Sequence, residues 1–111
     1  MKDHQEPVKN ALEDISKLNG MRFIWNSKGP APLIGKPDVG IIAQDVKEVY
    51  PELVTTRDNG DLGVSYNGLI PVLIEAVKEL KGTVDKFKEA NQVALDKILE
   101  LESIIRRSNN G

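Results

Sequence analysis

Residues 69–105 read LIPVLIEAVKELKGTVDKFKEANQVALDKILELESII, and their apolar side chains recur at alternating spacings of three and four residues. The spacing holds over five heptads, and ten of its eleven positions are apolar. A sustained repeat of this kind is typical of a coiled coil rather than of an ordinary surface helix. The pattern therefore predicts a long C-terminal helix with an interface of Ile70, Leu73, Val77, Leu80, Val84, Phe87, Asn91, Ala94, Ile98, Leu101 and Ile105.

The repeat leaves the number of helices open. Branched residues at the first core position of each heptad, with leucine at the second, favour two helices. Apolar residues beside the core positions, among them Leu69, Ile74 and Leu95, widen the stripe and favour three or more. Asn91 is the polar member of the stripe and is expected to fix the register. The helix suits an oligomerisation stalk, or a clamp that splays around another part of the same polypeptide.

The first 67 residues are of a different kind, since they hold five of the six prolines. We predict an α+β fold, with residues 1–67 as a small globular part and residues 68–111 as the long helix. A globular part of this size is marginally stable alone, so its apolar surface is expected to be covered. The expected elements are a helix at 7–18, strands at 21–25 and 39–42, a helix at 43–50, and a hairpin of 53–57 and 62–66. Asn59-Gly60 is expected to turn the hairpin, with both residues at positive φ.

Composition excludes several classes of function. Fifteen basic and 17 acidic side chains give a formal net charge of −2, which offers no basic surface for nucleic acid. The chain has no cysteine and one histidine, so thiol chemistry and cysteine or histidine zinc sites are not expected. No apolar run reaches about 18 residues, so no membrane partner is predicted. Neither a metal ion nor a cofactor is predicted, and the N-terminus does not resemble a secretory signal.

Four segments together are distinctive. They are Leu18-Asn-Gly-Met-Arg-Phe-Ile-Trp25, Gly40-Ile-Ile-Ala-Gln-Asp-Val46, Tyr50-Pro-Glu-Leu-Val54 and Leu69-Ile-Pro-Val-Leu-Ile-Glu-Ala-Val-Lys-Glu-Leu80. In this order they resemble the C-terminal intramolecular chaperone domain of bacteriophage tailspikes and tail fibres, the endosialidase-type self-cleaving domain. The resemblance extends to about residue 85, and it makes Gly40, Gln44 and Asp45 the motif residues.

The resemblance implies a homotrimer that holds three chains in register and helps an upstream β-rich fibre or spike of the same polypeptide to fold. Such trimers depend on non-local contacts and fold slowly, whereas a coiled coil forms locally and concentrates the neighbouring chains. The resemblance also implies release by autoproteolysis. The expected location is the cytoplasm of the infected bacterium during assembly, and the cleaved domain is expected to be absent from the mature virion.

The cleavage chemistry of the family resembles a Ser-Lys dyad, in which a neutral lysine is the general base. Met1-Lys2-Asp3 matches the end of the family pattern Ser-Asp-x-Arg-Leu-Lys, so Lys2 is the candidate base. The serine would lie four residues before Met1, so this chain is expected to be inactive as given. One departure is Asp38, where many members have histidine. Two alternatives stay open, namely a self-processing serine endopeptidase and a plain trimerisation module without a chaperone role.

Overall fold

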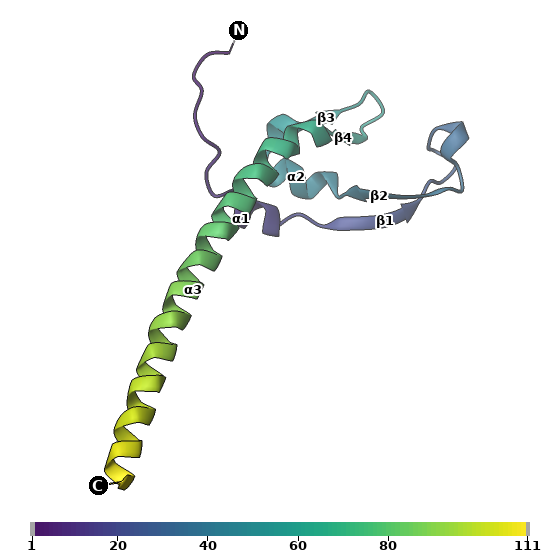
Figure 1. Ribbon diagram of the computed structural model, residues 1–111. Helices are drawn as coiled ribbons and strands as arrows, with labels where there is room; N and C mark the ends of the chain where they lie inside the picture. The colour runs from purple at the N-terminus through teal and green to yellow at the C-terminus, as the bar shows by residue number, and fades with distance from the viewer. Residues whose placement is uncertain (1, 111) are drawn as a thin grey trace. The chain divides into compact units, whose positions relative to one another are not determined.

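The computed structural model describes residues 2–110. The chain forms two compact units, residues 1–77 and 78–111, and each is described here by itself. Helix α3 runs from Tyr66 to Asn110 and contributes to both (Figure 1).

The first unit combines short helices with short antiparallel strands, so the α+β class is confirmed. Its strands form two separate two-stranded sheets, β1–β2 and β3–β4. Two single-turn 3-10 helices interrupt the loops. In chain order the elements are α1 (Ala11–Ser16), β1 (Gly20–Ile24), η1 (Ala31–Leu33), β2 (Pro37–Ile41), α2 (Ala43–Val49), η2 (Pro51–Leu53), β3 (Val54–Thr56), β4 (Leu62–Val64) and the start of α3.

Helix α1 is shorter than the helix predicted at 7–18. Asn10 adopts a left-handed conformation with φ 57°, and this conformation cannot belong to a right-handed helix. At the other end, the N–H groups of Lys17 and Leu18 donate to Asp14 and Ile15 in tight three-residue turns. The hydrophobic spacing was therefore correct, but local backbone geometry limits the helix to six residues.

The β3–β4 hairpin has a different turn from the predicted one. The N–H of Arg57 donates to the carbonyl of Asp61 at 2.7 Å, which leaves three residues in the loop. Among these three only Gly60 has a positive φ, of 89°, so the prediction for Asn59 was wrong. A three-residue loop needs one left-handed residue at its end, whereas a two-residue loop needs two.

The start of α3 also differs from the prediction, which placed Tyr66 in a strand. The Oγ of Ser65 accepts a hydrogen bond of 3.3 Å from the N–H of Gly68. Ser65 thus caps the helix by satisfying one of its free donors. Because β4 ends at Val64, Tyr66 becomes the first helical residue, and its ring lies near β2.

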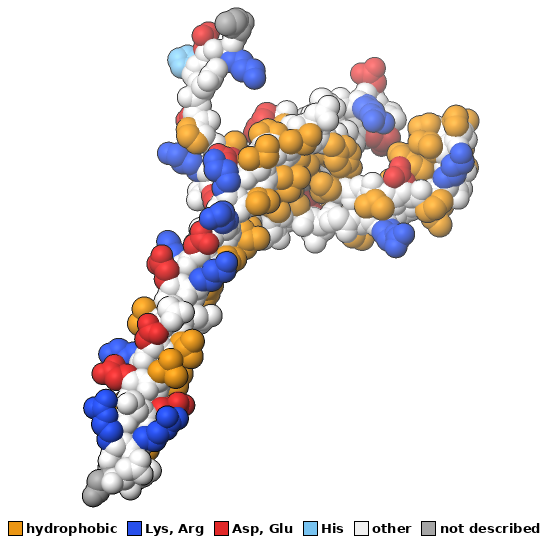
Figure 2. Space-filling model, in the orientation of Figure 1, with side chains coloured by type: hydrophobic (Ala, Val, Ile, Leu, Met, Phe, Trp, Pro, Cys, Tyr) orange, Lys and Arg blue, Asp and Glu red, His pale blue; other side chains and the backbone are white. Residues whose placement is uncertain are grey.

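The core of the first unit is small. Ala11, Val72 and Ala76 form one buried cluster, which joins α1 to the start of α3. Val46 of α2 and Leu69 of α3 are the other buried apolar residues among those described. The hydroxyl of Tyr50 donates to Asp14 Oδ2 at 3.1 Å and ties the end of α2 to α1. Many apolar side chains consequently remain on the surface, as Figure 2 shows in orange.

The second unit is the α3 segment after residue 77, and it is helical as far as Asn110. Its polar face carries side-chain pairs one turn apart. The Nζ of Lys81 lies 2.7 Å from Asp85 Oδ2, and Gln92 Nε2 donates to Asp96 Oδ1 at 2.9 Å. Such pairs stabilise an exposed helix modestly, by about 0.2–0.5 kcal/mol each. Among residues 2–110, no helix combines the length and the hydrophobicity that a membrane crossing requires.

Candidate functional site

Gly40 lies where three elements meet. Its backbone is in β2, and a Cβ atom at this position would lie 2.9 Å from the hydroxyl oxygen of Tyr66. The same atom would lie 3.2 Å from Cε1 of Phe23 in β1. Only glycine leaves room for both rings. The Tyr66 hydroxyl uses this room to accept a hydrogen bond of 3.2 Å from the N–H of Ile41. Gly40 thus permits the contact between β2 and the first turn of α3.

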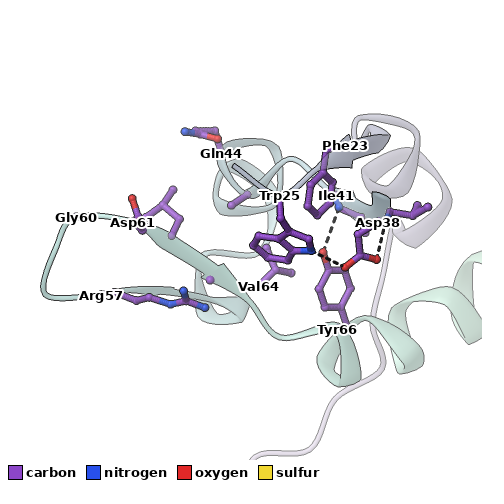
Figure 3. A pocket seen from close by; sticks show the side chains of 14 residues that line it. Phe23, Trp25, Asp38, Ile41, Gln44, Arg57, Gly60, Asp61, Val64 and Tyr66 are labelled. Atoms are coloured by element: carbon purple, nitrogen blue, oxygen red, sulfur yellow. Dashed lines mark hydrogen bonds between the residues drawn. The ribbon is translucent and has the colours of Figure 1, made fainter. Parts of the chain in front are cut away.

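Asp38 is held by two donors. The indole N–H of Trp25 donates to Oδ2 at 3.2 Å, and the N–H of Val39 donates to Oδ1 at 2.8 Å. Phe23 stands edge-on to Trp25, with ring centroids 5.1 Å apart and an interplanar angle of 78°. Figure 3 shows Asp38, Trp25 and Tyr66 gathered at one side of the site. The Asp38 carboxylate therefore holds the Trp25 side chain in place, next to Phe23, on the two-stranded sheet of β1 and β2.

Asp45 is in the first turn of α2, where a carboxylate interacts favourably with the helix dipole. No side chain caps this helix by a hydrogen bond, so the role of Asp45 is a different one. Its Oδ2 accepts a hydrogen bond of 2.9 Å from Nδ2 of Asn19. The carbonyl of Asn19 in turn accepts from the N–H of Ile42 at 3.2 Å. Asn19 and Asp45 together fix the start of α2 to the start of β1.

A cavity of about 540 Å³ opens beside these residues, between β2 and the β3–β4 hairpin. Its walls include Trp25 and Asp38 on one side and Arg57 and Val64 on the other (Figure 3). Gln44 is exposed at its edge. The structure therefore brings Gly40 and Gln44 to one region, with Asp45 next in the chain. Within residues 2–110 no cluster of side chains suited to a metal ion is found.

Lys2 is exposed and lies in the segment before α1, which contains no helix or strand. It is not among the residues that line the cavity beside Gly40. The role of Lys2 as the general base therefore remains a prediction.

Helix α3 has two distinct apolar faces. Within the first unit, Leu69, Val72 and Ala76 are buried against the rest of the unit. The predicted interface positions of the same segment, such as Leu73 and Val77, are exposed. In the second unit the predicted interface residues are exposed as well, and Phe87 is 66% exposed. The stripe that the heptads describe therefore has no partner within residues 2–110 of a single chain.

Sequence reasoning missed several residues of this region. It assigned Leu69 to a wider oligomer stripe, although this side chain packs inside its own chain. Asn19 was recognised as part of the segment from Leu18 to Trp25, and Ser65 was placed in a strand. Two signals were available in the sequence. Ser65 lies three residues before Gly68, which is the spacing of a helix cap, and Leu69, Val72 and Ala76 have the spacing of a separate apolar helix face.

The structure is thus a small α+β unit with few buried residues, continued by a helix whose apolar stripe meets no partner within residues 2–110. A family model described as "Chaperone of endosialidase" matches residues 1–55, a range that includes Lys2, Gly40, Gln44 and Asp45. The chain belongs to the chaperone of endosialidase family.

Similar proteins include long tail fiber proteins of phages. Long tail fiber protein Gp37 of Enterobacteria phage K3 is 33% identical over 96 residues, which cover 79% of this chain and 7% of that protein. Gp37 of Enterobacteria phage T2 gives the same identity and the same coverage. Gp37 of Escherichia phage AR1 is 34% identical over 77 residues, 64% of this chain and 7% of that protein. The chain thus spans about 7% of the length of these relatives.

Proposed function

We propose that this chain is the intramolecular chaperone domain of a phage tail fibre or tailspike. In this proposal it brings three copies of the polypeptide together through α3 and assists the folding of the fibre ahead of it. Membership of the chaperone family supports the chaperone role, and the similarity to long tail fiber proteins supports a fibre as the client. The relatives are far longer than this chain, as expected for a domain that serves a much larger polypeptide.

The exposed stripe on α3 is the observation that carries the proposal. Full burial of one large apolar side chain stabilises a structure by about 1.5–3 kcal/mol. Nine interface positions with large apolar side chains, from Ile70 to Ile105, are exposed in the single chain. Figure 2 shows part of this stripe on α3. Association of identical helices is the simplest way to bury the stripe. The exposed apolar residues beside it, such as Ile74 and Leu95, and the bulk of Phe87 favour three helices over two.

The order of folding events follows from contact distances along the chain. A helix forms through contacts four residues apart, whereas a β-rich fibre depends on long-range pairing. Association of α3 would therefore come early and would hold three fibre chains at a high effective concentration while they fold.

Self-cleavage after folding is the second part of the proposal. Lys2 would act as general base for a serine ahead of residue 1, as in the family pattern. Cleavage would separate the folded fibre from its assembly domain and make the assembly hard to reverse. The place of action is the cytoplasm of the infected bacterium, and the mature virion would lack the domain.

The chaperone role is tested with a fibre segment fused ahead of this chain. We expect soluble, protease-resistant trimeric fibre from the fusion and aggregated fibre without the domain. Replacement of both Leu80 and Val84 by serine should abolish formation of the resistant fibre, whereas Lys86→Ser on the polar face should preserve it. Equal yields of resistant fibre with and without the domain would overturn the chaperone role. Resistant fibre from any unrelated trimeric coiled coil would reduce the domain to a plain trimerisation module.

The cleavage role needs a separate test. A chain extended at its N-terminus by Ser-Asp-x-Arg and a fibre segment should cut itself, as judged by mass spectrometry. Lys2→Ala and Lys2→Arg should both prevent cutting, because a guanidinium group does not lose its proton at neutral pH. Lys9→Ala is the matched control and should cut normally. Cutting by the Lys2→Ala variant would remove Lys2 from the mechanism.

A further inference from the structure

The β1–β2 ribbon presents two free edges, and hydrogen bonds at its ends show which backbone groups reach them. Trp25 N donates to the carbonyl of Lys36 at 3.1 Å, and Ile42 N donates to the carbonyl of Asn19 at 3.2 Å. In the register that pairs Gly20 with Ile41, the odd-numbered residues of β1 therefore bond to β2. The N–H and C=O groups of Gly20, Arg22 and Ile24 point away from β2. On β2, those of residues 37, 39 and 41 point away from β1.

The donors on the free edge of β2 are all blocked. Pro37 has no N–H. The N–H of Val39 donates to Asp38 Oδ1 at 2.8 Å, and the N–H of Ile41 donates to the Tyr66 hydroxyl at 3.2 Å. A further strand could not form a regular ladder on this edge. Proteins protect exposed sheet edges by such means.

The free edge of β1 has no such protection. None of the hydrogen bonds found among residues 2–110 uses the outward backbone groups of Arg22 or Ile24. All five residues of β1 are exposed, and Ile24 is 67% exposed. Figure 1 shows β1 on the side of β2 that faces away from the β3–β4 hairpin. An exposed strand with unpaired donors and acceptors is a template for pairing with another chain.

We propose that the β1 edge pairs with an extended segment of the fibre polypeptide while that polypeptide folds. This inference rests on the proposed function, because the occupant is the client of the chaperone. A two-stranded ribbon with exposed faces is marginally stable in water, and a third strand would stabilise it. A folding β-rich fibre exposes strands whose backbone groups are still unpaired.

A second copy of this chain fits the β1 edge less well. Pairing of β1 with β2 of another copy is prevented because the β2 donors are blocked. Pairing of β1 with β1 places the same edge on both partners, and such an isologous contact makes pairs rather than three-fold rings. The side chains also favour a particular client strand. Arg22 is the only charged residue of β1, so a strand with an acidic residue among apolar ones would be complementary.

The experiment uses this chain and a synthetic peptide of about six residues, the length of an ordinary strand, that alternates valine with threonine and contains one glutamate. Hydrogen exchange of individual amides is followed by NMR. We expect exchange at Arg22 and Ile24 to slow by roughly tenfold or more at saturating peptide. Exchange at Val39 and Ile41 should not change, because these amides are already bonded.

Two proline variants form a matched pair, because each removes an outward N–H and leaves the β1–β2 ladder intact. Ile24→Pro should weaken peptide binding roughly fivefold or more, as expected for at least one lost hydrogen bond. Val39→Pro lies on the blocked edge and should bind the peptide as the unmodified chain does. The amide of Phe23, which bonds to β2, reports whether the ribbon is intact in each variant, and Arg22→Pro replaces Ile24→Pro if the ribbon is lost.

Three outcomes would overturn the inference. The first is that the peptide leaves hydrogen exchange at Arg22 and Ile24 unchanged. The second is that Ile24→Pro and Val39→Pro weaken peptide binding equally. The third is that, without peptide, the Arg22 and Ile24 amides become more protected as the chain concentration rises. The last would mean that a second copy occupies the edge. In the fusion assay, Ile24→Pro should lower the yield of resistant fibre while the trimer persists. If Ile24→Pro left the yield unchanged, the edge contact would be refuted but the chaperone role would not. If the fibre formed equally well without the whole domain, the chaperone role itself would be refuted.

Discussion

Replacement of Gly40 by alanine tests the junction of β1, β2 and α3 directly. The new Cβ would lie 2.9 Å from the Tyr66 hydroxyl, whereas ordinary contacts begin at 3.4 Å. The hydroxyl would thus have to move by about 0.5 Å, and we expect this movement to weaken its hydrogen bond with Ile41, which at 3.2 Å is already at the long end of the bonding range. We expect a loss of about 1 kcal/mol from this bond. Crowding against Phe23 should bring the total loss of unfolding free energy to about 2 kcal/mol.

The assay is urea unfolding at a fixed chain concentration, followed by the fluorescence of Trp25. Trp25 is the only tryptophan of the chain and contacts Phe23, so it reports on the same junction. Gly20→Ala is the matched control, because no atom lies within 4 Å of a Cβ at that position in β1. We expect that variant to be as stable as the original chain, or about 0.5 kcal/mol more stable, because alanine restricts the unfolded chain.

A double-mutant cycle with Tyr66→Phe separates the hydroxyl from the remaining crowding. Without the hydroxyl, Gly40→Ala should cost about 1 kcal/mol instead of about 2. If Gly40→Ala cost the same in both backgrounds, or no more than Gly20→Ala, the account of Gly40 as the residue that admits Tyr66 would be refuted.

Four further predictions concern the helices and the core. Gly82→Ala should stabilise α3 by about 1 kcal/mol in thermal unfolding, because alanine is the better helix former and a Cβ there meets no atom within 4 Å; a loss of stability would contradict this. Val46→Ala should lower the unfolding free energy in urea by about 2 kcal/mol, because Val46 is fully buried; no change would show that the site collapses without a cavity. Ser65→Ala should cost about 1 kcal/mol through loss of the helix cap, and Ser65→Asp should restore the stability if capping is the cause. Replacement of both Val84 and Phe87 by serine should lower the mass in light scattering from that of the proposed three chains toward the 12.3 kDa of one, and an unchanged mass would remove the α3 stripe from the interface.

Element types were predictable because they depend on local patterns. The spacing of apolar residues placed a helix at α1 and a long helix at α3, and the strand predicted at 21–25 lies close to β1. The ends of the elements were less predictable. Asn10 stops α1 through a backbone conformation that the hydrophobic spacing does not encode. The hairpin turn depended on whether two or three residues closed the loop, and the Asn59-Gly60 pair is compatible with either.

The motif residues were also predictable only in part. Their positions were recognised from the order of the sequence segments, but their roles were not. That Gly40 makes room for a tyrosine 26 positions later, or that Asp45 binds Asn19, follows from the path of the chain. The resemblance marked Asp38 as a departure from the family pattern, and the structure shows what its carboxylate does here: it accepts hydrogen bonds from Trp25 and Val39.

The sequence by itself determined the α+β class, the long helix and its heptad stripe, because periodicity records which side chains share a face. Periodicity does not record what each face meets. Only the tertiary structure decided that Leu69, Val72 and Ala76 turn inward while the heptad stripe stays unpaired. It also decided that β2 is sealed by Tyr66 and Asp38 while β1 stays open. The packing of α3 on α1 and the hydrogen bond from Ile41 to Tyr66 join segments distant in sequence, and such contacts form only when the chain has folded.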